Sequence, residues 1–318
     1  MSDTRSMERQ ELSQLLENAR APAPIATGID LAHETPGRAV RVADGFWILA
    51  TQHHPGGSRS FPEINNRCLI FELVENGVGV LLVINGVEPT AIAEVKRIEA
   101  ATGLRVRYVL SPGGGHHVLM PPWVAAFPEA SVLVGPERIP RTANGKRLLA
   151  MPGVATYDAR DVLPQFAGQL EFVSFTGLLG APDNRSPGEG GPDGIRLMFR
   201  MFVAMLFKIN DPVDELWTFH LPSRTLIGGE NLGWMFPKAA HASLPAMFRS
   251  MIEPDALYLF KDARKVGNAK LVDACWRRIL KWPAETVLTY HDPPGYGFQG
   301  DGRAALEAAV RRRGQLCS

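Results

Sequence analysis

The sequence predicts an α/β protein arranged as one αββα-like domain, and three features lead to this prediction. Short apolar runs bounded by turn residues alternate with segments of helical periodicity. The turn motif "ENG" at 75–77 separates two of these runs, as in an antiparallel hairpin. No internal repeat or linker clearly divides the 318 residues, so the sheets and helices are expected to share one domain.

The chain is expected to begin with an N-terminal arm over 1–40, ahead of a domain that spans 41–318. A short helix is predicted over 8–20, followed by a Pro- and Ala-rich stretch. Such arms often pack on a partner subunit, and we expect a homodimer; disorder of the arm is the alternative.

The first half of the domain is expected to combine strands with one amphipathic helix. The strands are predicted at 45–52, 66–74, 77–85 and 104–110. The helix precedes the last of them and is bounded by Pro89 and Gly103, which are typical of a helix start and a helix end.

The second half repeats this pattern more loosely. The predicted elements are a helix at 121–130, strands at 131–136 and 170–175, a hairpin over 214–232, a strand at 284–292 and a helix at 302–313. The Gly, Pro and Ser content of 181–194 predicts a loop. Residues at about 233–281 are expected to form a helical insertion.

Composition and charge limit the classes of function. Hydrophobic residues make up 45% of the chain and charged residues 21%, as in compact globular proteins. A net charge of +1 gives no electrostatic reason to expect nucleic acid or a membrane as partner. Cys68, Cys275 and Cys317 are too few and too scattered for a disulfide framework. We expect a cytoplasmic protein that acts on a small molecule.

The stretch "YVLSPGGGHHVLM", at 108–120, is the first candidate site. A predicted strand ends at Ser111 and is followed by a proline, three glycines, His116 and His117. The carboxyl end of a strand is the usual place for a site in such sheets. The alternative is a structural turn in which the two histidines cap a helix or bond to buried carbonyl groups.

The order of the segments resembles the metallo-β-lactamase fold superfamily over residues 41–311. The resemblance is carried by "VLLVINGVEP", a helix, "VLSPGGGHH", a hairpin that ends in "TLIGGEN", and "TYHD". It implies a four-layer αββα sandwich with a helical insertion. The stretch "FHLPSRTLIGGENL" also resembles uncharacterised branches of that superfamily.

Members of the superfamily carry an HxHxDH motif, and here this motif is degenerate. Pro112 and Gly114 stand at the two HxH histidines, and no histidine occurs between His117 and His220, where a further ligand is expected. The resemblance therefore implies that one of the family's two metal sites is lost.

The ligand types of the other site remain. His116 and His117 stand at the DH pair, Glu230 at the bridging carboxylate and His291 at the final histidine. The resemblance implies one divalent ion, with Zn²⁺ expected and Fe²⁺ or Mn²⁺ as alternatives. A single-metal site is similar to that of the zinc-dependent hydrolytic dehalogenases.

Three residues have candidate roles beside the ligands. His116 is either a ligand or the catalytic general base. Asp292 is the candidate catalytic carboxylate that orients His291. Asn85 stands where the family has a bracing Asp, and its "NG" sequence is also a simple turn motif.

A substrate pocket is expected around the metal site. Its candidate residues are His54, Asn231, Trp234, Phe236 and His241. Aromatic and Met side chains are frequent after Glu230, which favours an apolar or aromatic substrate, although a core role explains many of them.

Two functions follow from these expectations. The first is a metal-dependent hydrolase in which a metal-bound water attacks an electrophilic carbon of an ester, lactone, amide or activated aryl halide. The second is a metal-free pseudoenzyme or small-molecule-binding protein on the same fold.

Overall fold

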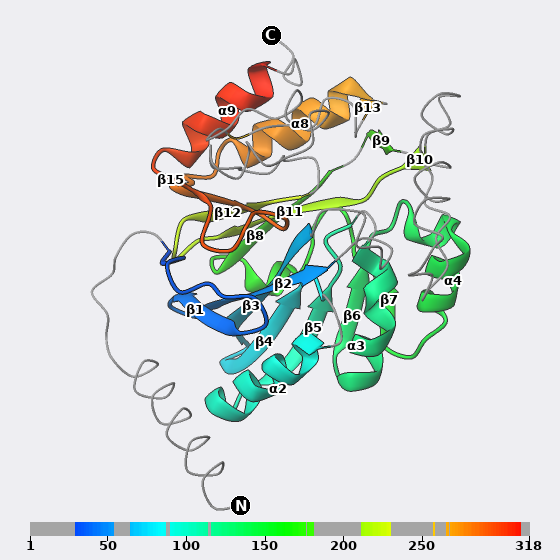
Figure 1. Cartoon of the computed structure of the whole chain (residues 1–318). Coiled ribbons are helices and arrows are strands. Elements are labelled where there is room, and N and C mark those ends of the chain that lie inside the picture. Colours follow the sequence, from blue (N-terminus) through cyan, green and yellow to red (C-terminus); the bar gives the residue numbers. More distant parts are fainter. Residues whose placement is uncertain are drawn as a thin grey trace, which may run out of the picture.

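The computed structural model describes residues 29–53, 64–86, 90–113, 116–175, 177–180, 211–229, 257, 265–266 and 268–312. Figure 1 shows two facing β-sheets with helices on both outer sides. This arrangement confirms the predicted α/β class and the four αββα layers.

The first sheet has seven strands in sequence order from β1 to β7. They are β1 (Ala39–Ala43), β2 (Phe46–His53), β3 (Ile64–Glu75), β4 (Val78–Ile84), β5 (Arg105–Leu110), β6 (Ser131–Val134) and β7 (Val154–Thr156). Strands β1 to β4 pair antiparallel, whereas β4 to β7 pair parallel. The predicted hairpin is confirmed, because Glu75 pairs with Val78 and both turn residues have positive φ, +51° at Asn76 and +80° at Gly77.

The second sheet has five strands in the order β15-β14-β12-β11-β8. They are β8 (Leu170–Phe175), β11 (Glu215–His220), β12 (Thr225–Gly228), β14 (Thr286–Thr289) and β15 (Phe298–Gln299). Among the described strands of this sheet, β12 and β14 pair in parallel and the other neighbours pair antiparallel. A small third sheet contains β9 (Leu178–Gly180), β10 (Asp211–Pro212) and β13 (Lys265–Val266).

Helices cover the outer faces of both large sheets. They are α2 (Thr90–Thr102), α3 (Met120–Ala126) and α4 (Ala143–Leu149) beside the first sheet, and α8 (Ala269–Ile279) and α9 (Gly302–Arg312) beside the second. Short 3-10 turns occur at η2 (His116–Leu119), η3 (Ile139–Arg141) and η4 (Pro164–Phe166). Among the described helices, none is long and apolar enough to cross a membrane.

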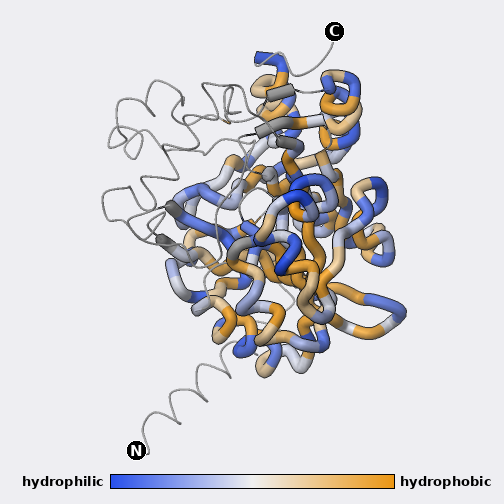
Figure 2. Tube along the Cα trace, turned by 90° about the vertical axis from the view of Figure 1, so that its right-hand side faces the viewer, coloured by the Kyte–Doolittle hydropathy of each residue, from blue (hydrophilic) through white to orange (hydrophobic). Residues whose placement is uncertain are grey.

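Side-chain alternation along the strands divides the core into three layers. Phe46 and Ile48 of β2 belong to the cluster between the sheets, whereas Trp47 and Leu49 pack on the side of α2 and α3. A third cluster joins the outer face of the second sheet to α8 and α9. Figure 2 shows the hydrophobic segments in orange running through the middle of the molecule.

Several elements differ from the prediction. Strands β1 and β7, helix α4 and the small sheet were not expected. Helix α4 contains Gly145, a poor helix former, but a side chain there would meet the Ile139 oxygen at 1.9 Å. Helix α3 ends before the predicted 130, because Pro128 disfavours helical geometry at Phe127. Strand β14 ends at Thr289, so His291 lies in a loop rather than on a strand.

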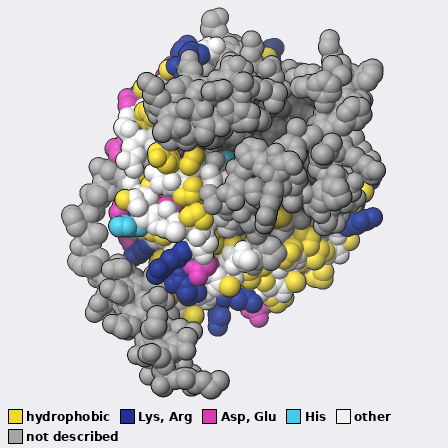
Figure 3. All heavy atoms as spheres, viewed as in Figure 1, with side chains coloured by type: hydrophobic (Ala, Val, Ile, Leu, Met, Phe, Trp, Pro, Cys, Tyr) yellow, Lys and Arg dark blue, Asp and Glu magenta, His cyan; other side chains and the backbone are white. Residues whose placement is uncertain are grey.

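The predicted arm and insertion are only partly described. Residues 1–28, the loop at 181–194 and most of 233–281 lie outside the described residues, so these boundaries stay predictions. Within the arm, Ile29 and Leu31 are buried in the cluster between the sheets. On the face shown in Figure 3, basic and acidic side chains of the described residues are interspersed, in keeping with the small net charge.

Candidate functional site

The stretch after β5 is a turn that packs against β11. The Leu216 N–H donates to the Pro112 carbonyl at 2.8 Å, and Gly113 pairs with Glu215 in an isolated β-bridge. Gly113 has φ of +114°, and a Cβ there would lie 2.1 Å from the Asp214 carbonyl oxygen. Glycine is therefore required at this position. The front of the candidate motif is a packing turn.

The structure brings His116 next to His291. The two rings are stacked, with centroids 5.3 Å apart and planes at 28°. Tyr290 adds a third ring at 6.0 Å from His116. His116 and His117 are both buried and follow each other on the turn η2. The ends of β5 and β14, far apart in sequence, thus supply neighbouring imidazoles.

Hydrogen bonding assigns the tautomer of His291. Its Nδ1 lies 2.8 Å from the main-chain oxygen of Asn65, which can only accept. Nδ1 therefore carries the proton and donates it, and in the neutral ring the lone pair lies on Nε2. A fixed neutral imidazole of this kind is a suitable metal ligand or proton acceptor.

Asp292 has other partners than the Nδ1 atom of His291. Its Oδ2 accepts from the main-chain N–H of Thr289 at 2.8 Å and from Nη1 of Arg67 at 3.2 Å. Asp292 was expected to orient the His291 ring. At Nδ1 of that ring, the Asn65 carbonyl makes the orienting hydrogen bond. Through these two hydrogen bonds, Asp292 holds the loop that contains His291 to Thr289 and Arg67.

Asn85 lies in a turn, as its "NG" sequence predicts, and its side chain bonds to strand β3. It has φ of +62°, as a turn residue of this type tolerates, and it is buried. Its side-chain Nδ2 donates to the Arg67 carbonyl at 2.8 Å. The amide thus fixes the turn after β4 to strand β3, next to the residues that contact His291.

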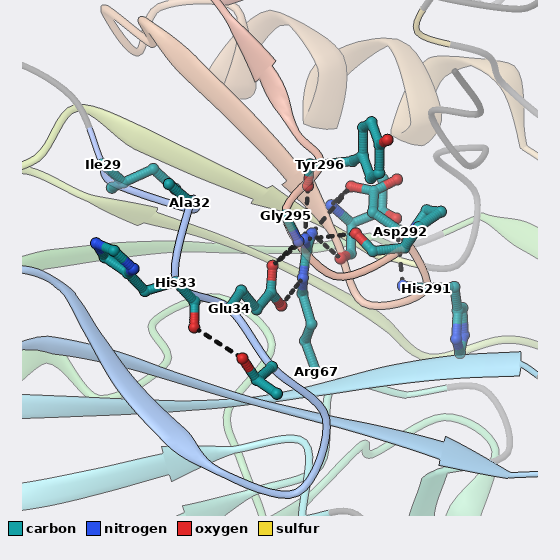
Figure 4. Close-up of polar contacts among 12 residues, drawn as sticks. Ile29, Ala32, His33, Glu34, Arg67, His291, Asp292, Gly295 and Tyr296 are labelled. Carbon is teal, nitrogen blue, oxygen red and sulfur yellow. Dashed lines mark hydrogen bonds and ion pairs between the residues drawn. The ribbon is translucent and has the colours of Figure 1, made fainter. Parts of the chain in front are cut away.

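Arg67 and Glu34 are residues of this region that the sequence did not single out. Figure 4 shows both side chains pointing to one another behind the loop that carries His291. Burial opposes the charge on Arg67, but the carboxylates of Glu34 and Asp292 raise its pKa above the ordinary value. The signal available was an arginine inside an apolar strand, "NRCLIF", which predicts a buried charge that needs a partner.

Asp214 anchors a second loop at the same edge. Its carboxylate accepts the main-chain N–H groups of Glu137 and Arg138, each at 2.8 Å. Burial raises the pKa of this carboxyl, and these hydrogen bonds partly oppose that rise. Asp214 thus holds the segment after β6 against the segment before β11.

His220 lies away from these groups, in the core between the sheets. Its ring packs on Phe46 and Phe71, and its Nδ1 lies 2.7 Å from Ser223 Oγ. Burial lowers the pKa of His220 to about 4, so the ring is neutral at pH 7. These contacts give it a structural role.

The predicted ligand set is only partly described. Among the residues that the structure describes, no three His, Cys, Asp or Glu side chains lie close enough to hold a metal ion, so the three described candidates His116, His117 and His291 do not form a metal site by themselves. Two neighbouring imidazoles, one with a fixed tautomer, nevertheless match the donor chemistry that zinc uses. The remaining candidates lie outside the described residues: Glu230, Asn231, Trp234, Phe236, His241 and His54.

Comparison with known proteins gives matches in structure but not in sequence. No protein-family model and no curated protein matches the sequence. A metallo-β-lactamase from Pontibacter korlensis is similar at 15% identity and a TM-score of 0.45, with 86% of this chain and 98% of that chain covered. The metallo-β-lactamase FIM-1 from Pseudomonas aeruginosa, in its mono-zinc form, has 12% identity, a TM-score of 0.46 and coverage of 92% and 100%.

A β-lactamase domain protein from Burkholderia ambifaria is similar at 13% identity and a TM-score of 0.47, with 90% of this chain and 80% of that chain covered. The first two of these proteins are named as metallo-β-lactamases and the third as a β-lactamase domain protein. These three similarities carry no conclusion about the ligands or the activity of this chain.

Proposed function

We propose that this chain is a metal-dependent hydrolase with one divalent ion, and that the ligands are His116, His117, Glu230 and His291. The observation that carries the proposal is the His291 ring. Its Nδ1 proton is engaged by Asn65, and the ring stacks on His116. An imidazole held in this tautomer has its lone pair on Nε2, the atom that would bind a metal ion.

A divalent ion bound by these residues would act as a Lewis acid and lower the pKa of a bound water to about 7. The reaction proposed is hydrolysis at an electrophilic carbon of an ester, lactone, amide or activated aryl halide. The chain's own contribution is orientation, because the Asn65 carbonyl fixes His291 and the turn at Gly113 fixes the start of η2. If His116 is not a ligand, its burial beside His291 suits a general base.

We also propose the identity of the metal, the class of substrate and the setting of the protein. Zinc is the proposed metal, with iron or manganese as alternatives, and an apolar or aromatic small molecule is the proposed substrate. A homodimer in the cytoplasm is the proposed setting.

Metal analysis of untagged protein tests the proposal. We expect about one equivalent of metal per chain, lost in His117→Ala and in His291→Ala. His33→Ala is the matched control, because the His33 side chain is 80% exposed and lies outside the site. A wild-type chain without metal, even after incubation with zinc, would contradict the proposal.

A metal-free binding protein is the second candidate. It is favoured by the front of the motif, where Pro112 stands at a lost ligand position and accepts a hydrogen bond from the Leu216 N–H of β11. If the chain is a metal-free binding protein, His117→Ala and His291→Ala do not change the metal content. Zinc then does not alter the thermal unfolding of the wild type.

A further inference from the structure

Three charged side chains form a buried network behind His291. Nε and Nη2 of Arg67 each donate to one carboxylate oxygen of Glu34 at 2.7 Å, and Nη1 donates to Asp292 at 3.2 Å. The side chains of Arg67 and Glu34 are 0% exposed and that of Asp292 is 1% exposed. Charges removed from water to this extent require their partners.

The guanidinium also binds the backbone of the loop at 289–296 (Figure 4). It donates, at 3.4, 3.1 and 2.5 Å, to the main-chain oxygens of Thr289, Pro293 and Tyr296. Glu34 accepts the Gly295 N–H at 2.7 Å. The loop therefore turns three carbonyl groups toward one cation, and His291 lies within this loop.

Strand β3 contacts the loop through Asn65 and Arg67, two residues apart. The Asn65 carbonyl accepts from the His291 ring, and the Arg67 side chain holds the loop backbone. The Arg67 N–H also donates to the Tyr290 carbonyl at 2.8 Å. One strand thus fixes both the ring and the loop that carries it.

The network supplies hydrogen-bond partners to the loop backbone in addition to pairing its own charges. Apolar side chains of similar volume often stabilise a fold as well as a buried ion pair does. They would leave three converging carbonyl groups and the Gly295 N–H without partners. The charged side chains of Arg67, Glu34 and Asp292 therefore define a single backbone conformation for the loop at 289–296.

We propose that Arg67, together with Glu34 and Asp292, is the positioning group of the site and keeps His291 in one place and one tautomer beside His116. The assignment of His291 as a ligand rests on the proposed function, whereas its positioning is a property of the metal-free chain. Glu34, from the predicted N-terminal arm, is then part of the site's scaffold.

The test uses the full-length, metal-free chain with ¹⁵N-labelled histidine. Long-range ¹H–¹⁵N correlation spectra report the tautomer of each ring, and His291→Ala identifies the signals of His291. In the wild type we expect one tautomer with the proton on Nδ1. Arg67→Lys keeps a charge but loses the fork that binds Glu34 and the carbonyl groups, and Glu34→Gln removes the paired charge.

In both variants we expect the His291 signals to move toward an average of two tautomers and the His116 signals to shift. The signals of His220 should stay in place, since that ring reports the core between the sheets. Glu72→Gln is the matched control on strand β3, because Glu72 accepts from Trp47 Nε1 at 2.6 Å and takes no part in the network.

A single Nδ1–H tautomer of His291 in folded Glu34→Gln overturns the positioning proposal, and so does an equal change in Glu72→Gln. If Arg67→Lys does not fold, Glu34→Gln and Asp292→Asn decide the outcome. Zinc titration is a separate measurement, in which we expect affinity to fall roughly 10- to 100-fold in Glu34→Gln. A wild-type chain that binds no zinc contradicts the proposed function and leaves the spectra of the metal-free chain as the test of positioning.

Discussion

The main-chain oxygen of Asn65 accepts a hydrogen bond from Nδ1 of His291 at 2.8 Å, which joins the start of strand β3 to the loop after β14. This contact connects the two sheets at the edge where His116 follows β5. Because the same strand supplies Arg67, changes in the buried network are expected to affect both the stability of the fold and the geometry of the site.

Arg67→Met is expected to destabilise the fold by about 3–5 kcal/mol, because it leaves the carboxylates of Glu34 and Asp292 buried without their cation. Urea unfolding measures this loss. Arg311→Met is the control, since Arg311 pairs with Glu307 on the surface of α9, where such pairs contribute about 0.3–0.5 kcal/mol. Equal losses in the two variants would contradict the account of the network.

Asn85→Asp is expected to destabilise the fold by about 1–3 kcal/mol, since a buried carboxylate would replace the Nδ2 donor and face the Arg67 carbonyl. Asn76→Asp is the matched control, because Asn76 also has positive φ but lies in the exposed hairpin turn. Thermal or urea unfolding compares them. The idea fails if Asn85→Asp is no more harmful than Asn76→Asp.

Gly113→Ala is expected to disrupt the turn before His116. A methyl group would lie 2.1 Å from the Asp214 carbonyl in addition to the strain of a positive φ. Gly37 also has a positive φ, of +80°, but a Cβ there meets no atom within 4 Å, so Gly37→Ala should cost only the backbone strain, about 1 kcal/mol. Unfolding midpoints that fall equally in both variants would show that the contact with β11 is unimportant.

His220 is expected to make stability depend on pH below neutrality. Its folded-state pKa of about 4 lies below the ordinary 6.5, so the unfolded chain binds the proton first as pH falls. Stability is therefore full above pH 6.5 and is lost toward pH 4, by about 3 kcal/mol if only this group is counted. The measurement is the difference in unfolding free energy between wild type and His220→Gln at pH 7 and pH 4.5. A difference that does not change with pH would refute the assignment.

Local patterns predicted the elements that depend on neighbours in sequence. The hairpin of β3 and β4 has the turn residues that its geometry requires, and α2 ends at Thr102, directly before Gly103, where φ is +73°. Helix α4 was missed because Gly145 disfavours a helix, and its reason for being there is a contact with Ile139. Helix propensity is a property of the local sequence and does not include a contact of this kind.

Site contacts between distant segments were predicted less well. The order of the motifs placed His116 and His291 at one site, and their rings do stack. The partner of the His291 ring was assigned to the next residue, Asp292, but a main-chain oxygen of β3 is the group at Nδ1. Backbone acceptors carry no sequence signal. Glu34 was assigned to an arm, because nothing near it in sequence indicates that Arg67 is its partner.

Zinc-edge anomalous diffraction from crystals of the untagged wild-type chain grown with zinc decides whether His291 is a metal ligand. We expect one strong peak per chain at about 2.0–2.1 Å from Nε2 of His291, with His117 and Glu230 among its other ligands. The peak should be absent from crystals of His291→Ala. The proposed metal site is wrong if wild-type crystals show no peak at His291, or if crystals of His291→Ala show the same peak.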